Sequence, residues 1–368
     1  MRHMRILVFI CFLLSAALLA LPASATAANT PHLKLVPASN PNYAYAGRID
    51  FSTPAAPKFY WAGDSATIGF TGRSFDVVLD DPNGGVYFDI IIDGDGKHRH
   101  VIHCRKGRHV YAVARHLADT PHTLEVFRRV DPTLPVVMFD GIKIAKPATV
   151  FRPNLHHSLN IVYYGDSITS GFGVLAPSGG DQRKLAYMDN YVAYGAIVAR
   201  ALHAGYRSIS LSGIGILESW FPLVMPRMYD RLAPKDPTSH WNFSSWTPDI
   251  VVVNLLQNDS WLLPRRKHPP SRQQIIDAYA GFIHSLRTHY PHAAIVCMLG
   301  NMSITAKGSA WPGYVEAAVE HMRAEGDHDL YMLIVPFKNT PGHPDIAEQR
   351  ELAQALEARI TAIRSSNR

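Results

Sequence analysis

The clearest sign of architecture in this chain is the stretch Ile161-Val162-Tyr163-Tyr164-Gly165-Asp166-Ser167-Ile168-Thr169. A short apolar, β-prone run ends abruptly at Gly165-Asp166-Ser167, and two further glycines, Gly171 and Gly173, follow closely. This pattern is typical of a buried parallel strand that carries a nucleophilic serine at its carboxyl end. If Ser167 has that role, we expect a base and oxyanion-binding groups after the later strands.

The chain around and after this stretch alternates between strand-like and helical patterns. Strand-like runs occur at 160–164, 207–211, 249–256, 293–299 and 330–335. Helical patterns run from Tyr191 to Leu202 and from Gln273 to Leu286, and a last one runs from Ile346 to Ile363. This alternation predicts a parallel sheet with helices on both faces. We place this domain at residues 155–368.

Residues 31–148 have a different pattern, with short alternating runs and no convincing helix. Examples are Phe75-Asp76-Val77-Val78-Leu79 and Tyr87-Phe88-Asp89-Ile90-Ile91-Ile92, separated by the turn signal Asp81-Pro82-Asn83-Gly84-Gly85. Many short strands at this spacing predict an antiparallel β-sandwich. The prolines around Lys146 to Asn154 indicate a linker to the second domain.

The first 25 residues have the features of a signal peptide. Arg2 and Arg5 precede the apolar run from Ile6 to Leu21, and Ala23-Ser24-Ala25 fits a small-residue cleavage site. The apolar run falls short of the ~20 residues of a membrane-spanning helix. We therefore expect export and no stable membrane insertion after cleavage, with periplasm, cell surface and medium all left open.

Cysteine content and charge narrow the function further. Only Cys104 and Cys297 follow the signal segment, each in or beside a strand-like run, which favours two buried free thiols over a disulfide or a metal site. The net charge is +6, and the one compact basic cluster, Arg265-Arg266-Lys267-His268, lies among prolines. A solvated loop is the better interpretation, so we expect no nucleic-acid partner. The oligomeric state is left open.

Each strand-like run of the second domain is followed by a polar or glycine-containing segment. In chain order these segments are Gly165-Asp166-Ser167, Ser212-Gly213-Ile214-Gly215, Asn258-Asp259, Gly300-Asn301 and Gly342-His343-Pro344. Ligands of parallel sheets bind outside the carboxyl ends of the strands. The five segments therefore predict one site at one edge of the sheet.

The residue types at this edge fit an ester-cleaving site. A serine hydroxyl needs a base within hydrogen-bond reach, and His343 can take the proton and return it to the leaving alcohol. The backbone N–H groups of Ser167 and Gly213 and the side-chain amide of Asn258 can converge on an oxyanion. Gly165, Asp166 and Asp259 are expected to support the turns that hold these groups. No metal or organic cofactor is implied.

These motifs resemble the four blocks of the SGNH (GDSL-type) hydrolase superfamily, which supplies Ser, Gly, Asn and His for catalysis. The closer resemblance is to carbohydrate esterase family 2, whose members join an N-terminal jelly roll to an SGNH domain and deacetylate plant polysaccharides. Further segments that carry it are Gly47-Arg48-Ile49-Asp50-Phe51, Arg128-Arg129, Met225 to Arg231 and Trp246-Thr247-Pro248-Asp249. The resemblance implies a jelly-roll-like sandwich, a flavodoxin-like five-stranded sheet and an acetylated carbohydrate substrate.

The chain departs from this superfamily at two positions. Leu256 stands where a glycine usually precedes the asparagine block, and we expect its side chain to narrow the pocket or shift the loop of Asn258. The position three residues before His343 is Thr340, where many members have an aspartate. We therefore expect a Ser167–His343 dyad, with a backbone carbonyl fixing the imidazole tautomer. Asp345 lies too close to His343 in the sequence to be adopted as a third member.

One further tripeptide and two tryptophans carry alternative interpretations. A second Gly63-Asp64-Ser65 is interpreted as a turn that enters a sandwich strand. Trp261 and Trp311 are candidate sugar contacts, although core packing explains each equally well. The sequence thus predicts an exported acetyl esterase acting on polysaccharides or oligosaccharides through an acetyl-serine. The alternatives are a lipid-directed esterase or thioesterase, and a non-catalytic carbohydrate-binding or assembly protein on a degenerate scaffold.

Overall fold

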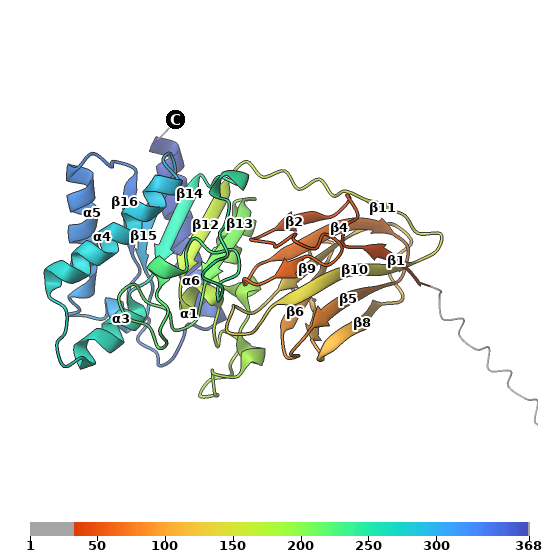
Figure 1. Ribbon diagram of the computed structural model, residues 1–368, viewed down its shortest axis with the longest axis horizontal. Coiled ribbons are helices and arrows are strands. Elements are labelled where there is room, and N and C mark those ends of the chain that lie inside the picture. The colour runs from red at the N-terminus through yellow and green to blue at the C-terminus, as the bar shows by residue number, and fades with distance from the viewer. Residues whose placement is uncertain (1–32, 367–368) are drawn as a thin grey trace, which may run out of the picture. The chain divides into compact units, whose positions relative to one another are not determined.

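A computed structural model describes residues 33–366 of the chain. Figure 1 shows its strands and helices. The predicted signal peptide, residues 1–25, lies outside the described residues. None of the helices described is both long and apolar enough to cross a membrane.

The N-terminal part is a sandwich of two antiparallel sheets, as the alternating runs predict. One sheet has the order β1-β10-β5-β8 with β3 paired to β10, and the other has β11-β4-β9-β6-β7 with β2 paired to β4. The strands are β1 (Leu33–Pro37), β2 (Ala44–Ala46), β3 (Lys58–Phe59), β4 (Ser65–Thr71), β5 (Phe75–Asp81), β6 (Tyr87–Ile92), β7 (His100–His103), β8 (Gly107–Ala114), β9 (Pro121–Arg128), β10 (Val137–Ala145) and β11 (Val150–Phe151).

The inward-facing residues of the sandwich form one apolar core. Four phenylalanines at its centre, Phe59, Phe70, Phe75 and Phe88, are fully buried. Cys104 is a buried free thiol at the edge of this core, and Cys297 is a second one in the parallel sheet, so the prediction of two unbridged cysteines is confirmed.

The C-terminal part is built on a five-stranded parallel sheet. Its strands are β12 (Asn160–Gly165), β13 (Gly205–Ser210), β14 (Ile250–Asn254), β15 (Ala294–Leu299) and β16 (Leu330–Ile334). The order β13-β12-β14-β15-β16 corresponds to 2-1-3-4-5 in chain order, which is the flavodoxin-like order. The predicted sandwich and parallel sheet are therefore both present.

Helices cover both faces of the parallel sheet (Figure 1). On one face α4 (Arg272–His289) and α5 (Trp311–Ala324) pack against the core, and on the other α2 (Tyr194–Ala201) packs beside α6 (Ile346–Ser366). The predicted helix from Tyr191 begins later, because the 3-10 turn Asn190–Val192 precedes α2. The remaining short helices are α1 (Ser167–Ser170), α3 (Gln257–Leu262), η1 (Leu185–Tyr187), η2 (Asn190–Val192), η3 (Met225–Arg227), η4 (Phe243–Ser245), η5 (Leu263–Arg265) and η6 (Ser303–Thr305).

The second Gly63-Asp64-Ser65 is a structural turn at the start of β4, as predicted. The Asp64 carboxylate accepts backbone N–H groups from Arg48 at 3.0 Å and from Tyr60 and Trp61 at 2.8 Å. Arg48 itself is buried, and its guanidinium donates to the carbonyl oxygens of Tyr229 at 2.6 Å and Arg231 at 2.8 Å. This turn therefore helps to join the sandwich to the parallel-sheet part.

Candidate active site

Ser167 lies at the carboxyl end of β12, the second strand in the order of the parallel sheet. Asp166 caps the short helix α1, and its carboxylate accepts the backbone N–H of Ile168 at 3.0 Å. There is no room for a side chain at position 165, since a Cβ added to Gly165 would overlap the Thr169 hydroxyl. The strand therefore turns sharply and presents Ser167, which is only 6% exposed, at the edge of the sheet.

His343 is paired with Ser167 across the site. Its Nε2 lies 2.9 Å from the Ser167 Oγ, which is within the range that a general base requires. The Phe172 ring packs against the imidazole at a centroid distance of 4.8 Å. Burial, and after it the positive charge of Lys338, lowers the pKa of His343 from 6.5 to about 4. The imidazole is therefore neutral at neutral pH and able to accept the serine proton.

The third member of a triad is absent among residues 33–366, where Ser167 is the single hydrogen-bond partner of the His343 ring. Asp345 instead accepts the Glu348 backbone N–H at 2.9 Å and so caps α6, while the Thr340 hydroxyl donates to Glu348. The carbonyl that we expected on Nδ1 has no counterpart in this part of the chain. Pairing of Ser167 with His343 alone stays a prediction for catalysis.

The predicted oxyanion groups lie together next to Ser167. Gly213 follows β13 with a φ of 88°, a conformation that favours glycine. The Asn258 amide donates to the Ile214 carbonyl at 2.8 Å and to the Asp166 carboxylate at 3.3 Å. Asn258 therefore links the turn of Ser167 to the loop of Gly213. Convergence of its amide with the N–H groups of Ser167 and Gly213 on an oxyanion stays a prediction.

Asp259 supports the Gly213 loop. Its buried carboxylate accepts backbone N–H groups from Ile216 at 2.9 Å, Leu217 at 2.7 Å and Glu218 at 2.9 Å. Hydrogen bonds from N–H groups to a carboxylate are stronger than those to neutral acceptors. The predicted supporting role of Asp259 is thus consistent with its contacts, which fix the loop that follows β13.

Leu256 keeps the backbone conformation of a glycine but places its side chain in the core. Its φ is 75° and its ψ is −7°, at the residue that precedes α3. The side chain is fully buried and belongs to the core cluster on the α4 and α5 side of the sheet. The side chain of Leu256 therefore packs in the core and does not narrow the pocket, whereas the alternative, that Leu256 shifts the loop of Asn258, stays a prediction.

The exposed tryptophan of the site is Trp220, which the sequence analysis missed. It is 57% exposed, its backbone N–H donates to the Gly213 carbonyl at 3.1 Å, and its indole N–H donates to Asn258 Oδ1 at 3.0 Å. Of the two predicted contacts, Trp311 packs on the core beside Tyr314, and Trp261 donates to Ser303 at 2.9 Å. Neither makes a hydrogen bond to Ser167 or His343, and the closeness of Trp220 to Gly213 in the sequence was the signal that could have found it.

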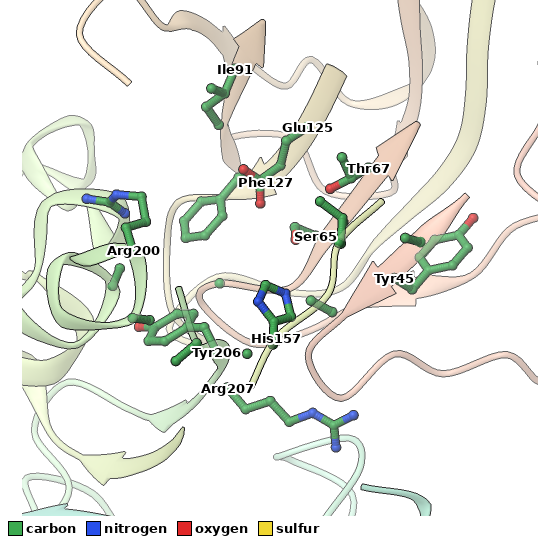
Figure 2. Close-up of a pocket in the computed structure, with 18 of the residues that line it drawn as sticks. Tyr45, Ser65, Thr67, Ile91, Glu125, Phe127, His157, Arg200, Tyr206 and Arg207 are labelled. Carbon is green, nitrogen blue, oxygen red and sulfur yellow. The ribbon is translucent and has the colours of Figure 1, made fainter. Parts of the chain in front are cut away.

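A cavity of the described residues lies away from Ser167 and His343. It has a volume of about 450 Å³, and neither Ser167 nor His343 lines it. Figure 2 shows Ser65, Glu125 and Arg200 among its lining residues. These come from β4, β9 and α2, so the cavity lies between the sandwich and α2.

A parallel sheet of this order, with serine and histidine paired at its carboxyl edge, defines a hydrolase of the α/β class. Comparison with known families agrees. Residues 163–366 match the GDSL-like Lipase/Acylhydrolase family, and residues 45–153 match the family Carbohydrate esterase 2 N-terminal. The chain therefore belongs to the GDSL-like Lipase/Acylhydrolase family and is a hydrolase.

Relatives with known names share both parts of the chain. The Cellulase/esterase CelE of Acetivibrio thermocellus is 28% identical over 329 residues, which cover 87% of this chain and 39% of that protein. This chain thus spans less than half the length of that relative. An Acetylxylan esterase / glucomannan deacetylase of Cellvibrio japonicus is 21% identical, with 89% of this chain and 90% of that one covered. A solved family two carbohydrate esterase from Clostridium thermocellum, in complex with cellohexaose, is similar with a TM-score of 0.77 at 28% identity, covering 87% of this chain and 98% of that one.

Proposed function

We propose that this chain is an exported esterase that removes acetyl groups from polysaccharides or oligosaccharides. The observation that carries the proposal is the 2.9 Å contact between Ser167 Oγ and His343 Nε2 beside the Gly213 loop. The named relatives support the substrate class, since one is an acetylxylan esterase and glucomannan deacetylase and another was solved with cellohexaose bound.

The reaction has two steps. Ser167 Oγ attacks the acetyl carbonyl carbon while His343 takes the hydroxyl proton, and the N–H groups of Ser167, Gly213 and Asn258 stabilise the oxyanion. His343 then gives the proton to the sugar oxygen as the C–O bond breaks, which leaves an acetyl-serine. Water, deprotonated by His343, attacks this ester, and His343 returns the proton to Ser167 Oγ as acetic acid leaves and ionises to acetate in solvent.

Trp220 is the group that favours a sugar over a plain acyl ester. Its exposed indole stands next to Gly213, and so beside the place proposed for the ester carbonyl. A flat aromatic surface stacks on the apolar face of a pyranose ring, and its N–H bond to Asn258 fixes its orientation. Export is proposed from the signal-like residues 1–25 alone.

The test compares the wild-type protein with Ser167→Ala on a chromogenic acetate ester and on longer acyl esters. We expect acetate release by the wild type and a loss of at least about 10³-fold in Ser167→Ala. Equal rates for both proteins would contradict the use of Ser167. Higher kcat/KM on long acyl chains than on acetate would favour a lipid-directed enzyme. Acetate release from acetylated xylan and acetylated mannan then identifies the preferred glycan.

A further inference from the structure

Within residues 33–366 no carboxylate binds the His343 ring as one does in a triad, so another group has to fix the position of His343. The side chain of Gln182 makes two hydrogen bonds to the backbone of His343. Its Oε1 accepts the His343 N–H at 2.7 Å, and its Nε2 donates to the His343 carbonyl at 3.1 Å. An amide that binds both backbone groups of one residue restrains that residue as a neighbouring strand would.

Two glycines make room for this contact. An added Cβ at Gly342 would overlap Gln182 Oε1, and one at Gly173 would lie 2.7 Å from the Gln182 Cβ. Both glycines have a positive φ, of 76° and 68° respectively. The backbone on each side of Gln182 is therefore shaped so that this side chain fits between the two loops.

The loop that carries Gln182 starts at the nucleophile. It leaves α1 and is closed at its base, where the Asp189 N–H donates to the Gly171 carbonyl at 3.1 Å. Within the loop, the Leu175 N–H donates to the Tyr187 carbonyl at 3.1 Å. Gln182 thus links the segment that follows Ser167 to the segment that presents His343.

The His343 segment is held from its own side by a buried ion pair. The side chain of Lys338 is 2% exposed, lies 3.2 Å from Glu348 and donates to the Thr340 and Pro341 carbonyls at 3.1 Å and 3.3 Å. These contacts are all within 338–348, so they set the shape of the segment and not its distance from Ser167. That distance depends on contacts with other parts of the chain, of which Gln182 makes two.

We propose that Gln182 is a positioning residue that sets the distance between His343 and Ser167 and takes the place of the missing triad carboxylate. The inference rests on the proposed function of Ser167 and His343. Because a misplacement of about 1 Å can lower a rate about 100-fold, loss of this contact is expected to lower kcat about 10- to 100-fold and leave KM nearly unchanged.

The experiment uses Gln182→Ala and Gln182→Glu, with Arg183→Gln as the matched control. Arg183 lies in the same loop, is 85% exposed and pairs with Asp181, and its change alters the net charge as much as Gln182→Glu does. We measure kcat per active site, titrated with a phosphonate inhibitor, together with KM and the pH profile for an acetate ester. Gln182→Glu keeps the acceptor for the His343 N–H, so we expect kcat to fall less than in Gln182→Ala. It also adds a negative charge near the imidazole, so we expect activity to be lost at a higher pH than in the wild type as the solution is made more acidic.

A double variant decides whether Gln182 acts through His343. If it does, Gln182→Ala lowers kcat in the wild-type background and has no further effect in His343→Ala. A kcat of Gln182→Ala within about 2-fold of wild type, or an equal loss in the His343→Ala background, would overturn the inference. The same holds if a lower titrated amount of active enzyme accounts for the whole loss. Failure of the proposed function is distinguishable, because Ser167→Ala would then keep wild-type activity.

Discussion

Leu256 offers a direct test of backbone strain at the start of α3. A φ of 75° is costly for a residue with a Cβ, by about 1–2 kcal/mol. Burial of the side chain opposes this cost, because removing a core leucine down to alanine destabilises a protein by about 2.7–5.0 kcal/mol. Packing therefore wins, and we expect both Leu256→Ala and Leu256→Gly to be less stable than the wild type.

The comparison of glycine with alanine isolates the strain. At an ordinary buried position glycine is worse than alanine by about 1.3–1.8 kcal/mol, from about 0.8 for the lost methyl group and 0.5–1 for chain entropy. At position 256 glycine also relieves the cost of the positive φ, so the gap should shrink by about 1–2 kcal/mol. Leu255 is the matched control, since it is buried in the same cluster and has no positive φ.

Urea unfolding of Leu255→Ala, Leu255→Gly, Leu256→Ala and Leu256→Gly gives their free energies of unfolding. The difference between glycine and alanine at position 255, minus the same difference at position 256, measures the strain. Equal gaps at positions 255 and 256 would refute the argument. Leu256→Gly should also keep kcat/KM for an acetate ester close to wild type, because glycine adopts the same φ without strain and leaves Asn258 in place.

Three further predictions concern the site. Since the pKa of His343 is lowered to about 4, the imidazole stays neutral in mild acid, so kcat/KM should stay level as the pH falls to about 5 and drop below pH 4. Lys338→Met removes a positive charge and should move this loss of activity to higher pH. A loss of wild-type activity already centred at pH 6.5 would contradict the lowered pKa. Asp259→Asn should lower the free energy of unfolding by about 1.5–3 kcal/mol, measured in urea, because the amide oxygen can keep the Leu217 and Glu218 N–H groups while the Ile216 N–H loses its acceptor. Trp220→Ala should raise KM for an acetylated oligosaccharide about 2- to 13-fold, whereas Trp220→Phe, which keeps a stacking ring, should raise it less.

The architecture was predictable because its signals are local. The runs that end at Gly165 and Asn254 are apolar and β-prone, so a few consecutive residues are enough to predict a strand that is buried on both faces of the sheet. The carboxyl ends of parallel strands lie along one edge of the sheet, and this rule then predicts that Ser167 and His343 lie together, although they are 176 residues apart in the sequence.

The supporting contacts were not predictable, because they depend on loops without periodicity. Gln182 and His343 are 161 residues apart, and nothing in the sequence around Gln182 indicates its partner. The same reason explains Trp220, which lies in the long segment between β13 and β14. For Leu256 the sequence indicates an unusual residue, but whether the side chain enters the pocket or the core is decided by the tertiary packing.

The sandwich contributes to the geometry of the active site through Asp131, which follows β9. Its buried carboxylate accepts both the backbone N–H of Ser212 at 2.7 Å and the Ser212 hydroxyl at 2.6 Å. Asp259 holds the same loop at residues 216–218, on the other side of Gly213. A donor for an oxyanion has to be held in place before the reaction begins. Two carboxylates, one on each side of Gly213, restrain the Gly213 loop better than one would. The sandwich therefore supplies one of the two carboxylates that hold the Gly213 loop, which links it to the proposed oxyanion site.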